Sequence, residues 1–190
     1  MWPSKQMKKE FAATQKKTIL ILCEQYKWKS CIIIYKNDEY GYNGMKFLTQ
    51  KFSTMNIKTL EKIKFDIKQQ NFQIDFKNTL LDSSSRIVIV WTNEKSTITI
   101  LEKALEDNLI GPYFVWILTT TVALYYFNQR QNKELIGILT VEPVKGDFID
   151  VPINTTLLNE AYKIWKYYEP DTVPGEANVS SYGLFTFDAT

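Results

Sequence analysis

The stretch KSCIIIYKNDEYGYNG, Lys29 to Gly44, decides the fold. In it the apolar run CIIIYK, Cys31 to Lys36, is followed by a polar turn and an amphipathic segment. Three further runs of β-branched and aromatic character are IKTLEKIKF (Ile57 to Phe65), RIVIVW (Arg86 to Trp91) and YFVWIL (Tyr113 to Leu118). Such runs are typical of strands buried on both faces, and their alternation with helices predicts a parallel sheet covered on each side. We therefore expect an α/β fold with an open, doubly wound parallel sheet.

Apolar residues at spacings of three and four predict helices between these strands. The clearest helix is Gly41 to Met55, in which Met45, Leu48 and Phe52 form one stripe. The other predicted helices are Lys8 to Tyr26, Asn71 to Leu81, Ile98 to Leu109, Thr121 to Gln131 and Leu157 to Tyr168. A fifth strand, LIGILTV, is expected from Leu135 to Val141. The final SSYGLFTFDAT reads as the start of another helix, so we expect the chain to be part of a longer protein.

Composition excludes several classes of function. The 190 residues are 45% hydrophobic and 14% aromatic, enough for a sizeable core. A net charge of +2, with the lysines scattered, gives no field suited to nucleic acid, so no nucleic-acid partner is expected. The chain contains no histidine, which removes imidazole catalysis and most zinc sites. The turn after the first strand offers only Gly41 and Gly44, and no GxGxxG. We expect no enzyme activity, no cofactor and no metal.

The two cysteines and the apolar segments say little about location. Cys23 and Cys31 cannot make a disulfide framework and are expected to pack as small apolar groups. The first residues, MWPSKQMKKEF, lack the apolar region of a secretory signal. The longest apolar stretch, Pro112 to Phe127, is too short to span a bilayer.

Aromatic, hydroxyl and amide side chains follow the predicted strands, where an open α/β sheet binds its ligands. The candidates are Asn37, Asp38 and Tyr40 after the first strand, Trp91 and Thr92 at the third, and Thr119 after the fourth. Such a set stacks on and hydrogen-bonds a small polar ligand without transforming it. Two alternatives stay open: Trp91 closes the hydrophobic core, and Asn37 with Asp38 caps the following helix.

Several segments together carry a family resemblance. They are WPS (Trp2 to Ser4), ATQKKTILILCEQYKW, KSCIIIYKNDEYGYNG, RIVIVWTNEKSTITILEKALEDNLIGPYFVWILT and LIGILTVEP. In this order they resemble the receptor family ligand-binding region. This is the periplasmic-binding-protein type 1 module of natriuretic peptide, metabotropic glutamate and GABA-B receptors, and of ionotropic glutamate receptor amino-terminal domains.

The resemblance implies two α/β lobes joined by crossovers, with a small amino-acid-like or peptide ligand held between them. Residues 1–142 would be the second lobe, and residues 143–190 a crossover with a returning part of the first lobe. It also implies the extracellular side of the plasma membrane, a transmembrane region outside this chain, and homo- or heterodimers. Binding would close the lobes. The sequons at Asn154 and Asn178 suit that location as glycosylation sites.

By resemblance, Tyr40 corresponds to the tyrosine that caps the ligand in amino-acid receptors. Trp91 matches the aromatic residue of the GABA-B branch, and Thr119 falls near an aspartate of the glutamate receptors. Lys5 replaces an acid of the glutamate branch and Thr119 is not acidic, which speaks against a glutamate-like ligand held in the same way. The aromatic end of the third strand leans towards a GABA-B-like receptor. Two rival functions stay open: a solute-binding protein that delivers a ligand to a transporter, and an enzyme of doubly wound fold.

Overall fold

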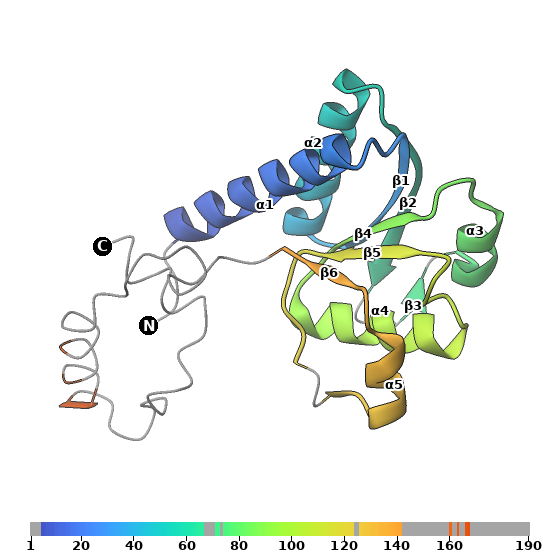
Figure 1. Cartoon of the computed structure of the whole chain (residues 1–190). Coiled ribbons are helices and arrows are strands. Elements are labelled where there is room, and N and C mark those ends of the chain that lie inside the picture. The colour runs from blue at the N-terminus through green and yellow to red at the C-terminus, as the bar shows by residue number, and fades with distance from the viewer. Residues whose placement is uncertain are drawn as a thin grey trace. The chain divides into compact units, whose positions relative to one another are not determined.

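The computed structural model describes residues 5–66, 71–72, 74–123, 126–141, 160, 163 and 166–167. Residues Ala12–Val141 form one compact unit, which contains the sheet (Figure 1). A second unit comprises Met1–Phe11 and Glu142–Thr190. The sequons at Asn154 and Asn178 lie outside the described residues. Of the predicted helix at 157–168, the described residues Glu160, Lys163, Lys166 and Tyr167 are helical.

The sheet has six strands in the order β3-β2-β1-β4-β5-β6. Five of them run parallel: β1 Ser30–Lys36, β2 Lys58–Asp66, β4 Ile87–Trp91, β5 Val115–Leu118 and β6 Leu139–Thr140. The two-residue β3, Asn71–Phe72, pairs antiparallel with β2 at one edge. From β1 the chain builds first towards β2 and then, on the other side, towards β4 and β5. The winding therefore reverses between β1 and β4, which is where sheets of this kind place a ligand. The predicted doubly wound parallel sheet is confirmed.

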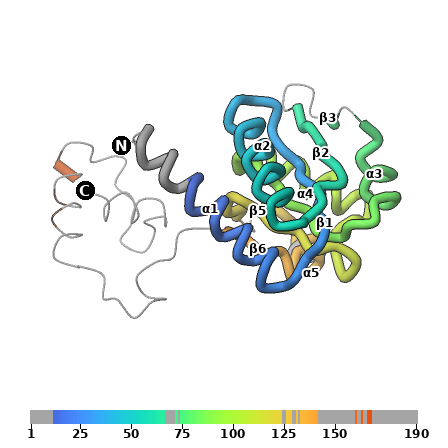
Figure 2. The backbone as a smooth tube through the Cα atoms, turned by 90° about the horizontal axis from the view of Figure 1, so that it is seen from above, coloured from blue at the N-terminus to red at the C-terminus, as the bar shows by residue number. Residues whose placement is uncertain are grey.

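Helices cover both faces of this sheet. On one face lie α1 (Lys5–Gln25) and α2 (Glu39–Thr54), which Figure 2 shows side by side over the strands. On the other lie α3 (Phe76–Asp82), α4 (Glu94–Glu106) and the short α5 (Gln129–Glu134) (Figure 1). Three turns that follow helices contain a residue in the left-handed conformation, namely Lys27, Asn56 and Asn108.

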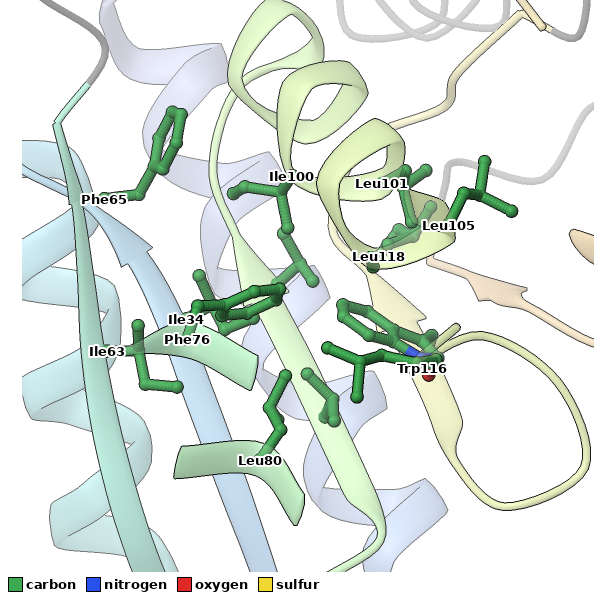
Figure 3. Close-up of a cluster of buried hydrophobic side chains, with 14 of the residues drawn as sticks. Ile34, Ile63, Phe65, Phe76, Leu80, Ile100, Leu101, Leu105, Trp116 and Leu118 are labelled. Carbon is green, nitrogen blue, oxygen red and sulfur yellow. The ribbon is translucent and has the colours of Figure 1, made fainter. Parts of the chain in front are cut away.

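Successive strand residues feed two separate cores, because side chains of a strand alternate between its faces. Cys31 and Ile33 of β1 pack under α1 and α2, whereas Ile32 and Ile34 pack under α3 and α4. Figure 3 shows the second core, in which Trp116 from β5 lies among side chains of α3 and α4. The Trp116 indole N–H donates to the Leu109 carbonyl at 3.0 Å, so this buried polar atom is paired. Burial on both faces explains why the strands read as continuous apolar runs.

Three predicted elements are wrong in type or length, and a fourth, the predicted helix Ile98 to Leu109, is found as α4 at Glu94–Glu106 and so begins four residues earlier. The predicted helix Asn71 to Leu81 begins as strand β3, and only residues 76–82 are helical, because Asp75 caps α3 through the Asn78 amide. The predicted helix Thr121 to Gln131 is absent at residues 121–123, and the helix found is α5, which begins after the capping box of Asn128 and Gln131. The predicted strand Leu135 to Val141 is reduced to Leu139–Thr140, since a turn with Gly137 at φ 98° occupies its start.

Candidate functional site

Tyr40 and Trp91 meet at the reversal point of the sheet. Tyr40 stands in the first turn of α2, directly after β1, and Trp91 is the last residue of the neighbouring β4. Their ring centroids are 5.7 Å apart with the planes tilted by 33°. Trp91 is wholly buried, whereas Tyr40 is 43% exposed. The two predicted ligand residues therefore form one aromatic pair, in which Trp91 supports the ring that solvent can reach.

Gly44 allows this packing. A Cβ on Gly44 would lie 2.1 Å from the Trp91 indole nitrogen and 2.3 Å from its Cε2. The indole therefore lies against the backbone of α2, one helical turn after Tyr40. Trp91 Nε1 has no hydrogen-bond partner among the described residues. Trp91 also belongs to the core under α1 and α2, so the interpretation of Trp91 as a core residue is correct for its position.

The polar turn between β1 and α2 is built by its own side chains. The Asp38 carboxylate accepts from the Gly41 amide at 2.8 Å, which makes it the N-cap of α2, and it pairs with Lys36 at 2.7 Å. Gly41 is required here because a Cβ would lie 2.1 Å from the Lys36 carbonyl oxygen. Asn37 instead donates to Asp66 at 3.0 Å, at the end of β2. Capping is confirmed for Asp38 and is wrong for Asn37.

The two predicted threonines use their hydroxyls within the Ala12–Val141 unit. Thr92 is buried, and its Oγ1 lies 2.7 Å from that of Thr97 in the first turn of α4. Thr119 is buried as well and donates to the Val90 carbonyl at 3.0 Å. Both stand at strand ends, as predicted, but their hydroxyls hold neighbouring elements together.

Gln15 of α1 reaches the same strand ends and was not among the predicted residues. Its side chain is buried; Oε1 accepts from the Tyr40 hydroxyl at 3.4 Å, and Nε2 donates to the Thr119 carbonyl. A second, longer bond at 3.5 Å runs from Nε2 to the Val141 carbonyl. The sequence does contain a signal, because Gln15 lies on the same helical stripe as Ala12, Ile19 and Cys23. A polar residue on an apolar stripe indicates a buried hydrogen-bond network.

Lys16, the next residue of α1, places its ammonium over two aromatic rings. Nζ lies 4.7 Å from the centroid of Phe47 and 5.8 Å from that of Trp91. Burial lowers the pKa of the Lys16 ammonium. Within the described part of the chain it has no carboxylate partner, so cation–π contacts take that place.

Neither a metal site nor a membrane span is found in the part of the chain that the structure describes. It holds no group of three histidine, cysteine or acidic side chains placed to bind an ion. Nor does it contain a helix with the length and apolar character needed to cross a bilayer. Cys23 and Cys31 are buried and unpaired with each other, as small apolar groups of the core, which confirms the prediction.

Comparison with known proteins identifies the family. The family model described as "Receptor family ligand binding region" matches residues 11–190. The chain belongs to this family. The resemblance read from the sequence is thereby confirmed, and the family consists of ligand-binding receptors and solute-binding proteins rather than enzymes.

Two curated plant proteins are similar to most of the chain. "Glutamate receptor 2.2" of Arabidopsis thaliana is 26% identical over 181 residues, which are 94% of this chain and 18% of that protein. "Glutamate receptor 3.1" of Oryza sativa subsp. japonica is 27% identical, over 88% of this chain and 18% of that protein. The chain thus spans about a fifth of the length of these relatives.

Solved structures share the fold. An extracellular ligand-binding receptor from Rhodopseudomonas palustris superposes with a TM-score of 0.65 at 16% identity, over 93% of this chain and 47% of that one. A possible leucine/isoleucine/valine-binding protein from Rhodopirellula baltica gives 0.61 at 16% identity, over 94% and 46%. This chain therefore spans a little less than half of each, and its receptor-type ligand-binding fold is of the periplasmic-binding-protein type 1 kind.

Proposed function

We propose that the chain is the second lobe, residues 1–142, of an extracellular bilobed receptor domain, with residues 143–190 returning towards the first lobe. The domain binds a small amino-acid-like ligand. The observation that carries this proposal is the exposed Tyr40 ring on buried Trp91 at the reversal point of the sheet. The similarity to plant glutamate receptors supports the ligand class.

In this proposal Tyr40 is the residue that contacts the ligand and Trp91 holds it in place. An aromatic ring fixed from behind loses little conformational freedom on binding, which favours affinity. Asp38 and Asn37 keep the turn that presents Tyr40, while Thr92 and Thr119 tie the ends of β4 and β5 to their surroundings. The ligand would favour the closed state of the two lobes by its contacts with both.

A matched pair of tyrosine variants tests whether Tyr40 contacts the ligand. The complete two-lobe domain is titrated by calorimetry with amino acids, GABA-like amines and short peptides. Tyr40→Ala should weaken binding about tenfold or more, the loss expected for an aromatic anchor. Tyr42→Ala is the control, because Tyr42 is 52% exposed in the same helical turn region. Equal affinities of the two variants would place the ligand elsewhere.

The GABA-B lean is tested in the same titration. It depends on Trp91, and because that side chain is wholly buried, it has no exposed surface to offer a ligand in this state. Preference for a GABA-like amine over amino acids would support the lean, and the reverse preference would reject it.

A solute-binding protein that serves a transporter is the alternative, favoured by the similarity of the fold to bacterial extracellular binding proteins. The coding sequence downstream distinguishes the two. Transmembrane segments in the same polypeptide support the receptor, and a stop codon soon after the second lobe supports the solute-binding protein.

Receptor membership also predicts dimers of the complete domain and glycans at Asn154 and Asn178. A mass shift after enzymatic deglycosylation would reveal the glycans.

A further inference from the structure

The buried side chain of Gln15 connects Tyr40 to the end of the sheet unit at Val141. The unit begins at Ala12 and ends at Val141, so the chain crosses to the second unit at these two points. Gln15 lies within the first helical turn after Ala12, and its Nε2 is 3.5 Å from the Val141 carbonyl oxygen. Its Oε1 accepts a hydrogen bond from the Tyr40 hydroxyl at 3.4 Å. One side chain therefore contacts the exposed residue of the candidate site and the crossing point at Val141, and it lies one helical turn after the other crossing at Ala12.

The chemistry of the partners determines how this amide is oriented. The Thr119 and Val141 carbonyls can only accept, so the amide nitrogen with its two N–H groups must face them. The carbonyl oxygen then faces Tyr40, whose hydroxyl donates. No other uncharged side chain of this length offers two donors and one acceptor at its tip. The position also differs from Ile19, one turn further along α1 on the same stripe, which is buried in the core without polar groups.

A buried amide that lost one of these partners would be left with unpaired polar atoms at a cost in free energy. A change at Tyr40 therefore alters the preferred orientation of the Gln15 amide. The hydrogen bonds from Gln15 to the Thr119 and Val141 carbonyls change with it. Thr119 and Val141 are themselves joined through β5, because the Val141 amide donates to the Leu118 carbonyl at 2.8 Å. The network is thus continuous from the candidate site to the end of the unit.

We infer that Gln15 is a positioning residue that couples Tyr40 to the chain crossing at Val141. A ligand group that takes the Tyr40 hydroxyl would change the hydrogen bonding of Gln15 and so the mobility of the crossing at Val141. By linkage, lobe closure in turn affects the ligand affinity of Tyr40. The ligand-linked part of this inference rests on the proposed function of Tyr40.

The first test needs no ligand and uses hydrogen exchange of the complete two-lobe domain. In Gln15→Met and in Tyr40→Phe, the amides of Thr119 and Val141 should exchange about fivefold faster, the factor that corresponds to the loss of one hydrogen bond. Tyr40→Phe is the informative variant, because it removes the hydroxyl that donates to Gln15 and leaves the Gln15 side chain in place. Tyr42→Phe and Gln25→Met serve as controls at exposed positions of α2 and α1. Unchanged exchange at Thr119 and Val141 in Tyr40→Phe would overturn the inference.

The second test is a double-mutant cycle on ligand affinity, with the strongest-binding L-amino acid of the panel as the probe. If Gln15 acts through Tyr40, the double variant Gln15→Met/Tyr40→Phe should bind no more weakly than the weaker single variant. If the two single substitutions weaken binding by factors that multiply in the double variant, Gln15 acts independently of Tyr40, and the coupling is overturned. Should no probe bind the wild-type domain, the proposed function fails, while the exchange experiment still decides whether Gln15 couples the two places.

Discussion

At residue scale, two glycines allow side chains and backbone to approach closely at the candidate site. Gly41 lets the start of α2 approach the Lys36 carbonyl, and Gly44 lets Trp91 lie on α2. Close contacts explain both, because a glycine within a helix is otherwise unfavourable by roughly 0.5–1 kcal/mol relative to alanine. The sequence contains the pattern Tyr-Gly-x-x-Gly, but the reason for its second glycine is visible only with Trp91 in place.

Gly44→Ala should destabilise the Ala12–Val141 unit by about 1–3 kcal/mol, although alanine is the better helix former. The new methyl group would collide with the Trp91 indole. Urea unfolding measures the change, with the exposed Asn43→Ala in the same helix as the control. The double variant Gly44→Ala/Trp91→Phe should recover part of the loss because the smaller ring makes room. A neutral Gly44→Ala would contradict the close packing of Trp91 on α2.

The two buried thiols predict a pH dependence of stability. Burial raises the pKa of Cys23 to about 11 and that of Cys31 to about 12. The unfolded chain loses these protons near the ordinary pKa of 9.0, so the thiols contribute their full stabilisation below that pH. As the pH rises from about 9 to about 12, the thiols ionise in the unfolded chain while they stay protonated in the folded protein. The free energy of unfolding therefore falls over this interval.

The measurement is the free energy of unfolding in urea between pH 7.5 and 10.5. The wild-type protein should lose more stability over this interval than Cys23→Ala/Cys31→Ala, whose remaining slope comes from lysine and tyrosine groups. Parallel curves for the two proteins would show that the thiols are not buried as the structure has them.

At the scale of elements, local side chains decide where the helices begin. Asp38, Asp75, Asn93 and Asn128 each accept a hydrogen bond from a backbone amide two or three residues into the following helix. Apolar periodicity alone places α2 within two residues of its start, because its stripe and its cap coincide. It fails for α3 and α5, where the apolar stripe begins before the capping residue, and for α4, where the stripe begins at Ile98 and the helix already at Glu94. Element boundaries near the sheet edge were therefore the part least predictable from the sequence.

Asp38→Ala should lower the free energy of unfolding by about 1 kcal/mol, because the first turn of α2 loses its cap. Asp38→Asn is the matched comparison, since its amide oxygen can still accept from the Gly41 amide. That variant loses only the partly exposed pair with Lys36, an effect of a few tenths of a kcal/mol. Thermal unfolding of the wild type, Asp38→Asn and Asp38→Ala gives the order of their stabilities. An asparagine variant as unstable as the alanine variant would assign the effect to charge rather than to capping.

At the scale of the molecule, the Ala12–Val141 unit has its own complete core. Helices α1 and α2 cover one face of the sheet, and α3 and α4 cover the other, so each face has its own buried cluster. Five of its six strands join residues far apart in sequence through parallel pairing, and β3 pairs antiparallel with β2. Such a unit meets the usual requirements of an independently folding domain.

Residues 12–141 expressed alone should therefore unfold in one cooperative urea transition. A chain of residues 28–141 lacks the covering residues Ile19 and Cys23 of α1 and should bind a hydrophobic dye without a cooperative transition. Circular dichroism and dye fluorescence distinguish the two. A cooperative transition in the shorter chain would show that α1 does not complete the core.

The sequence by itself determined the doubly wound parallel sheet, its family and the strand ends at which Tyr40 and Trp91 lie. These features are encoded locally, since a strand buried on both faces must be apolar throughout, and chain order alternates strand with helix. Only the tertiary structure decided that Trp91 is a buried support, that Thr92 and Thr119 use their hydroxyls internally, and that Gln15 joins the site. The burial of Trp91 depends on the packing of α2 on the sheet, and the hydrogen bonds depend on which polar atoms meet between residues 5 to 126 positions apart. Both follow from packing rather than from any local pattern.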